Sequence, residues 1–274
     1  MDLKFNARGI ALYQGFQILK KDEDIFHIND GSGAFVTLVR GEKMALLVDT
    51  SWGIKDLRSL VESLISTPYK VVNTHGHPDH CWGNFQFDEV FVPEKDVDVF
   101  YKMKNYTENR DALFKTDEER EAAKPREFPP LKTVREGDVF DLGGITVQVV
   151  PLYGHTHGSL GYLLKEKKIL ISGDSVTVSP WLFMKETLPL SECKKTYEET
   201  KKLDFEKILG SHSKVLWPKT LLDSLIDVID GVISGRIDLS EESVDEIMGY
   251  RTVSVFGEKE PGCWITINAD TWMH

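Results

Sequence analysis

The residues Thr74-His75-Gly76-His77-Pro78-Asp79-His80 place three imidazoles and a carboxylate within six consecutive positions. Neutral imidazole and carboxylate groups are the ligands that Zn²⁺ and similar divalent metals prefer. Residues 69–73 read as a short buried strand, so the ligands would lie on the loop that leaves its carboxyl end. His75 and His77 point the same way in an extended loop, whereas Asp79 and His80 diverge. One loop therefore has ligands for two neighbouring metal ions.

Other apolar runs of the chain also end in a side chain that can bind a metal. The runs cover residues 44–48, 147–154, 168–173 and 205–211, and the residues that follow them are Asp49, His155, Asp174 and His212. Open α/β sheets place their chemistry at the carboxyl ends of strands, and glycine near a strand end lets the backbone turn sharply. The repeated pattern predicts that these side chains join the His-rich loop.

In these motifs the chain resembles the metallo-β-lactamase-fold hydrolase superfamily. The motifs are Leu-Val-Asp49-Thr, Thr-His75-Gly-His77-Pro-Asp79-His80, Gly-His155-Thr-His157-Gly-Ser, Ser-Gly-Asp174 and Gly-Ser-His212, and they occur in the family's order. The resemblance implies an α/β (α+β) fold: a four-layer αβ/βα sandwich of two mixed β-sheets with helices outside. It also implies one domain over residues 1–274, to which we add a helical insertion around 94–135 and a C-terminal helical and strand extension, 218–274.

The resemblance also implies the role of each ligand. The first metal is expected on His75, His77 and His155, the second on Asp79, His80 and His212, with Asp174 as the bridge and Asp49 orienting the His-rich loop. This set resembles the glyoxalase II-like and lactonase-like branches. No cysteine stands at a matching position, which weakens a β-lactamase interpretation. A branch that binds two irons for electron chemistry would carry Glu at position 77, where this chain has His77.

The ligand set predicts a metal-dependent hydrolase. Two divalent ions, expected to be Zn²⁺ with iron or manganese as alternatives, would share a hydroxide that cleaves a thioester, lactone or amide of a small molecule. Asp79 and Asp174 are the expected catalytic carboxylates, since a free carboxylate oxygen can orient that hydroxide. Alternative functions on this scaffold are a mono-iron persulfide dioxygenase, a phosphodiesterase or nuclease, and a β-lactamase.

Composition limits the kinds of partner and the cellular location that we expect. The net charge of −11 disfavours nucleic acid, because no basic patch offsets it. No apolar run is long enough to span a bilayer, and no secretory signal is seen at the N-terminus. Three scattered cysteines suit a reducing compartment, so we expect a cytoplasmic protein. The sequence does not fix the oligomeric state.

Two segments are expected to line the substrate pocket. They are the insertion over 101–130 and the segment 176–190, where Trp181 and Phe183 are the candidate contacts. The sequence leaves open whether His157 or Cys81 takes part in the site. The simpler interpretations are a loop residue for His157 and a small buried residue for Cys81.

Overall fold

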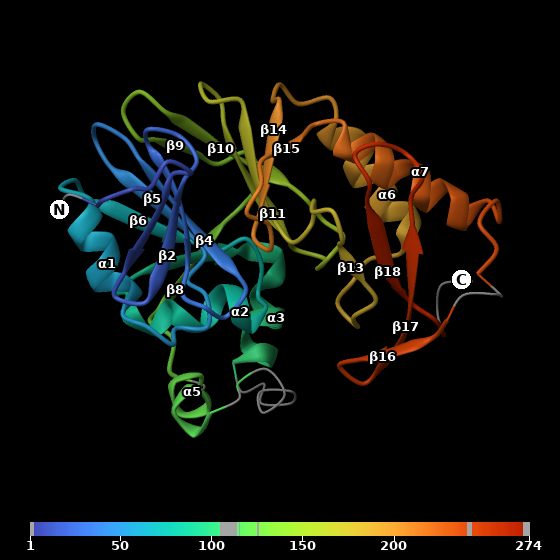
Figure 1. The fold of residues 1–274 in the computed structure, drawn as a ribbon, viewed down its shortest axis with the longest axis horizontal. Coiled ribbons are helices and arrows are strands. Elements are labelled where there is room, and N and C mark those ends of the chain that lie inside the picture. Colours follow the sequence, from blue (N-terminus) through green and yellow to red (C-terminus); the bar gives the residue numbers. More distant parts are fainter. Residues whose placement is uncertain (1–2, 105–113, 115, 125, 240–242, 271–274) are drawn as a thin grey trace.

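The first sheet of the sandwich forms around the strand that leads into the His-rich loop. The computed structural model describes residues 3–104, 114, 116–124, 126–239 and 243–270 (Figure 1). Within them the sheet has eight strands in sequence order, antiparallel from β1 to β5 and parallel from β5 to β8. The strands are β1 (Ile10–Tyr13), β2 (Phe16–Lys20), β3 (Ile25–Asn29), β4 (Phe35–Arg40), β5 (Ala45–Val48), β6 (Tyr69–Val72), β7 (Val90–Pro93) and β8 (Leu131–Val134).

The second sheet is also mixed, because β12 and β14 are parallel and the other neighbours are antiparallel. Its six strands within the described residues are, in spatial order, β15 (Trp217–Pro218), β14 (Lys207–Gly210), β12 (Ile169–Gly173), β11 (Leu160–Leu164), β10 (Thr146–Pro151) and β9 (Val139–Asp141). One apolar core holds the two sheets together, with Leu46 and Val72 from the first sheet and Val147, Tyr162 and Ile171 from the second. The expected sandwich of two mixed sheets is confirmed.

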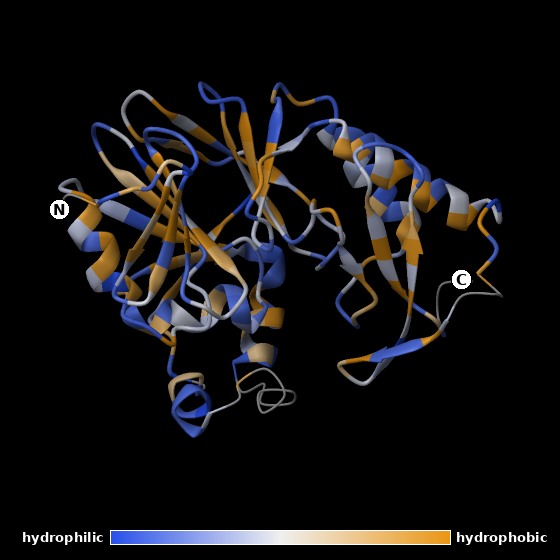
Figure 2. Cartoon of the chain, in the orientation of Figure 1, coloured by the Kyte–Doolittle hydropathy of each residue, from blue (hydrophilic) through white to orange (hydrophobic). Residues whose placement is uncertain are grey.

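Helices cover the outer faces of both sheets. Helix α1 (Leu57–Leu64) packs on the first sheet through apolar residues at helical spacing, and the Asp56 carboxylate caps it by accepting from Ser59 N. Helices α6 (Leu190–Thr200) and α7 (Leu221–Ile233) share a core with the second sheet. Hydrophobic residues, orange in Figure 2, follow the strands and the covered side of α7.

A third sheet extends the sandwich beyond the expected layers. It contains β13 (Trp181–Leu182), β18 (Trp264–Asn268), β17 (Tyr250–Phe256) and β16 (Asp245–Ile247) in spatial order. Its apolar side belongs to the same core as α7, and Figure 1 shows it at the end of the molecule opposite β1–β5. The C-terminal extension therefore joins the fold by pairing with residues 181–182, a short distance along the chain from Asp174.

The expected helical insertion at 94–135 needs a correction at its end. It begins with η2 (Glu94–Asp96) and α3 (Val97–Met103) and continues with α5 (Asp117–Ala122), but Leu131–Val134 is β8, the edge strand of the first sheet. The sequence Leu-Lys-Thr-Val is short and half exposed, so it carries little strand pattern. Residues 105–113, 115 and 125 of this insertion lie outside the described part. None of the described helices has the length and hydropathy that crossing a bilayer requires.

Candidate metal centre

The candidate ligands gather at one edge of the sandwich, where strands of both sheets end. Asp49 follows β5 directly, Asp174 follows β12 directly, and His212 comes two residues after β14. His75 and His77 lie on the loop after β6, and His155 on the loop after β10. Helix α2 (Pro78–Cys81) begins just after His77 and carries Asp79 and His80, and the His80 ring lies beside the His75 ring with 4.1 Å between centroids. The parallel pairing of β5 with β6 and of β12 with β14 places these ends together.

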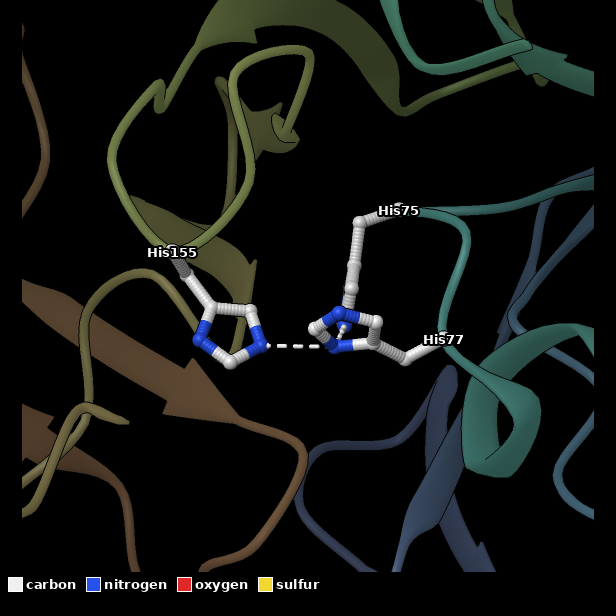
Figure 3. Close-up of side chains that lie close together, drawn as sticks. All are labelled: His75, His77 and His155. Carbon is white, nitrogen blue, oxygen red and sulfur yellow. Dashed lines mark hydrogen bonds between the residues drawn. The ribbon is translucent and has the colours of Figure 1, made fainter. Parts of the chain in front are cut away.

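Three buried imidazoles face one another from two of these loops (Figure 3). Nε2 of His75 and Nε2 of His155 each lie 3.0 Å from Nδ1 of His77. Nitrogen ligands at tetrahedral positions about 2.0–2.1 Å from a zinc ion would lie roughly 3.3 Å apart, close to this spacing. The three nitrogens thus surround a point that suits one small cation.

In each ring, the nitrogen that faces the other two rings is called the inner nitrogen and the other the outer nitrogen. The hydrogen bonds of the outer nitrogens indicate that the inner ones can bind a cation. Each outer nitrogen is bonded to a group that can accept its proton: His75 Nδ1 to Thr74 Oγ1 at 3.0 Å, His77 Nε2 to Glu186 Oε1 at 2.9 Å, and His155 Nδ1 to the Trp181 carbonyl at 2.8 Å. Thr74 Oγ1 itself donates to Asp49, so it accepts from His75. With the protons on the outer nitrogens, the inner nitrogens are three lone pairs without a donor. A metal ion satisfies such a set, and bonded outer nitrogens are typical of metal-binding histidines.

Burial and the neighbouring rings keep two of these imidazoles neutral, and the neutral imidazole is the form that binds a metal. Burial, followed by the neighbouring His80 and His77 rings, holds the pKa of His75 well below its usual value. Burial and His77 also lower the pKa of His155 to about 4. Both rings therefore offer a lone pair at neutral pH.

A second group, Asp79, His80, Asp174 and His212, lies beside the first. His212 Nε2 is 3.2 Å from Asp79 Oδ2 and 3.1 Å from Asp174 Oδ2. His80 Nε2 is 3.4 Å from a carboxylate oxygen of each aspartate. Among the described residues, buried His80 Nε2 and Asp174 Oδ1 face each other at 3.4 Å but neither forms a well-directed hydrogen bond, which is costly unless an ion or water completes them. The donor set and these two atoms fit a second divalent cation.

The charges of the second group show what an ion would replace. Burial would lower the pKa of His212, but the Asp174 and Asp79 carboxylates outweigh it and raise it to about 10. The same carboxylates raise the pKa of His80 well above its usual value, again against burial. Protons on two imidazoles thus balance two carboxylates, and a divalent ion could take their place.

Asp174 lies between the two groups. Its Oδ2 is 3.1 Å from His212 Nε2 in the second group and 3.8 Å from His155 Nε2 in the first. Of the described candidates, it is the carboxylate with contacts to both groups, which suits the bridging role expected from the sequence. That role stays a prediction.

The Asp49 carboxylate is hydrogen-bonded to His80 of the second group and, through Thr74, to His75 of the first. Asp49 is buried and has φ +67°, an uncommon conformation that Asp tolerates better than most residues. Its carboxylate accepts from Thr74 N at 2.7 Å, Thr74 Oγ1 at 2.9 Å and His80 Nδ1 at 2.9 Å. Thr74 in turn accepts from His75, so one carboxylate orients a candidate ligand of each group.

We expect Asp49→Asn to leave the fold intact and to lower zinc affinity or turnover by about 10–100-fold, as is typical when a group that orients a ligand is lost. The amide replaces one accepting oxygen with a donor, so one of the contacts to Thr74 or His80 must break. Zinc titration against a chromophoric chelator, with circular dichroism, measures the effect. Asp56→Asn is the control, because Asn also caps helices well. An unchanged titration together with an unchanged rate would show that Asp49 has no such role.

The sequence did not single out two buried carboxylates at this site. One is Glu186, the partner of His77. The other is Asp96, which accepts from Gly76 N at 2.8 Å and Gly158 N at 3.1 Å and so ties the two loops of the first triad together. A Cβ at Gly76 would lie 2.8 Å from Phe100 N, and one at Gly158 would lie 2.5 Å from Asp96 N. The sequence signal for this close packing is therefore Gly76, between His75 and His77, and Gly158, three residues after His155.

The remaining candidates are placed as follows. His157 is hydrogen-bonded to Asp98 at 3.1 Å, and its side chain is 35% exposed. Cys81 is fully buried, and its thiol is directed to the Gly76 carbonyl. Neither residue is a member of the two groups. Trp181 is 39% exposed. Phe183 is 2% exposed and packs against Trp181 at 5.2 Å and Tyr250 at 5.6 Å between ring centroids. Of the two pocket candidates, only Trp181 has a surface that a ligand can reach.

Comparisons with known proteins agree with this geometry. The family model described as "Metallo-beta-lactamase superfamily" matches residues 29–212. The chain is 29% identical over 211 residues to "Acyl-coenzyme A thioesterase MBLAC2" of Bos taurus, covering 66% of this chain and 74% of that protein. It is 26% identical over 144 residues to "Hydroxyacylglutathione hydrolase GloC" of Haemophilus influenzae, covering 48% of this chain and 61% of the relative. A solved structure of the metallo-beta-lactamase DIM-1 shares the fold, with a TM-score of 0.59 and 17% identity over 84% of this chain and 99% of that one.

Proposed function

The chain belongs to the metallo-beta-lactamase superfamily, and we propose that it is a metal-dependent hydrolase that cleaves the thioester bond of a small acyl carrier. The observation that carries this proposal is the convergence of seven ligand side chains in two adjoining groups. Three imidazoles and a bridging carboxylate would hold one ion, and Asp79, His80, His212 and the same carboxylate the other. Zinc is the expected metal, since imidazole and carboxylate suit it.

When bound, such a metal pair supplies an activated water at neutral pH and polarises the acyl carbonyl. The chain's own residues then do the rest. Asp174 Oδ1 is buried and faces His80 Nε2 at 3.4 Å. With His80 Nε2 given to a metal, this oxygen would have no other hydrogen-bond partner among the described residues and could accept a proton from the attacking water. Asp49 holds His80 through its Nδ1 at 2.9 Å, which leaves His80 Nε2 for the metal. This contact fixes the orientation of the His80 ring, as positioned catalytic groups require.

The thioester as substrate is supported by the relatives rather than by the metal groups. The two relatives described above carry the names of a thioesterase and of a hydroxyacylglutathione hydrolase. Both names describe hydrolysis of a thioester. The net charge of −11 continues to disfavour nucleic acid. Three buried, unpaired cysteines support a cytoplasmic location.

A substrate panel tests the proposal. The zinc-reconstituted protein is assayed with an acyl-coenzyme A, an acyl-glutathione, a lactone, a β-lactam and a phosphodiester, and oxygen uptake is followed with glutathione persulfide. We expect the highest kcat/KM for a thioester and no oxygen uptake. Hydrolysis confined to the lactone, β-lactam or phosphodiester, or oxygen uptake with iron, would replace thioester cleavage by the corresponding activity.

Of the two pocket candidates, we expect Trp181 to contact the substrate and Phe183 to stabilise the fold. We expect Trp181→Ala to raise KM several-fold without changing metal content, because the change removes an exposed ring but keeps the carbonyl that holds His155. Phe183→Ala should instead destabilise the fold by about 3–5 kcal/mol, the usual cost of deleting a buried ring. Steady-state kinetics across the panel and thermal melting measure the two effects. Wild-type KM values for Trp181→Ala would place the pocket elsewhere.

A further inference from the structure

The segment after the bridging Asp holds two of the three imidazoles of the first triad. Glu186 Oε1 accepts from His77 Nε2 at 2.9 Å, and the Trp181 carbonyl accepts from His155 Nδ1 at 2.8 Å. The backbone of the His155 loop is bound as well: Thr187 Oγ1 donates to the His155 carbonyl at 3.1 Å, and Leu188 N donates to the Gly154 carbonyl at 2.9 Å. Sequence reasoning assigned this segment only to the pocket wall.

Glu186 is an unusual side chain for such a segment. Its carboxylate is 4% exposed and has two partners in the described residues, His77 on one oxygen and Lys102 Nζ on the other at 2.9 Å. A buried carboxylate is costly unless it is paired and hydrogen-bonded. The Lys102 side chain is 50% exposed and comes from α3 in the insertion, so the carboxylate joins the insertion to the metal loop.

We propose that Glu186 is a positioning residue that fixes the His77 ring for metal binding, with Lys102 as its counter-ion. The inference rests on the proposed metal-binding role of His77. Because Glu186 accepts a hydrogen bond from Nε2–H, the proton stays on Nε2 and the lone pair on Nδ1 is directed at the other two rings of the triad. A carboxylate on the outer nitrogen also makes the imidazole a stronger ligand. The segment 181–188 thereby acts as a support for the first metal and not only as a wall of the pocket.

The test compares Glu186→Ala, Glu186→Gln and the control Glu192→Gln, an exposed glutamate of α6. Stepwise zinc affinities are measured with a competing chelator, and the visible spectrum of the Co²⁺ form reports the coordination of the first site. We expect Glu186→Ala to weaken one of the two zinc-binding steps by about 10–100-fold and to change the Co²⁺ spectrum. Glu186→Gln keeps an accepting oxygen but loses the charge, so it should recover part of the affinity.

A second readout does not need metal. In the apoprotein labelled with ¹⁵N-histidine, long-range ¹H–¹⁵N spectra distinguish the two neutral tautomers. We expect His77 to carry its proton on Nε2 in the wild type and to become a mixture in Glu186→Ala. If Glu186→Ala folds poorly, Glu186→Gln alone decides the question. Unchanged zinc affinities and an unchanged tautomer would overturn the role of Glu186, whereas a wild type that binds no zinc would overturn the proposed metal site itself.

Discussion

Asp174→Ala should lose thioester hydrolysis by more than about 100-fold, since even groups that only orient a metal ligand cost 10–100-fold when they are removed. Asp174 contacts both groups, and its Oδ1 is the buried oxygen proposed to take the proton of the attacking water. We also expect the second metal to be lost more readily than the first. The first group keeps three imidazoles, whereas the second keeps one carboxylate for two histidines.

Elemental analysis and steady-state kinetics on the same preparation measure both effects. Asp204→Ala is the control, because Asp204 is an exposed aspartate that pairs with Lys168 before the parallel strands β12 and β14, whereas the ligands follow the opposite ends of these strands. A variant of Asp174 that keeps two metals and full activity would show that the bridging assignment is wrong.

His155→Ala should remove the first metal with a comparable loss of activity. His155 is the only member of the first triad that comes from the second sheet, so the other two rings are left as an incomplete pair on one loop. The same loop supplies a matched control. His157 stands two residues later, is partly exposed and bonds to Asp98, so His157→Ala should behave like the wild type.

Zinc content and kcat/KM of the two variants decide between the two histidines. A wild-type zinc content in His155→Ala would mean that the triad does not hold a metal. A loss of zinc in His157→Ala would show that the loop interpretation of His157 is wrong and that the ring joins the site.

Local signals in the sequence predicted much of the fold. Helix α7 (Leu221–Ile233) lies within the helical and strand extension expected over 218–274, and β5, β6, β10, β12 and β14 end close to the candidate ligands that follow the apolar runs. Strand β8 was missed because an edge strand of four residues with exposed sides has little pattern. Strands were expected in the C-terminal extension, but their pairing with residues 181–182 was not, because it joins Trp181 to Thr266, two residues far apart in sequence.

In the candidate site, the ligands could be predicted from the sequence and the carboxylates that orient them could not. Its ligands lie in compact motifs after strands, where residue type and position together indicate metal chemistry. The carboxylates behind them have no such motif: Glu186 is 109 residues from His77, and Asp96 is 20 residues from Gly76. Each looks like an ordinary charged residue of a polar segment until the fold buries it. Only the three-dimensional arrangement shows which acidic residues support the ligands.

The number of metal ions per chain tests the central claim most directly. The protein is stripped with a chelator, reconstituted with excess Zn²⁺, freed of unbound metal and measured by elemental analysis alongside thioester hydrolysis. The two groups of ligands predict close to two zinc ions per chain, with activity absent from the stripped protein and restored with zinc. One ion per chain after full reconstitution, or hydrolysis that persists without metal, would contradict it.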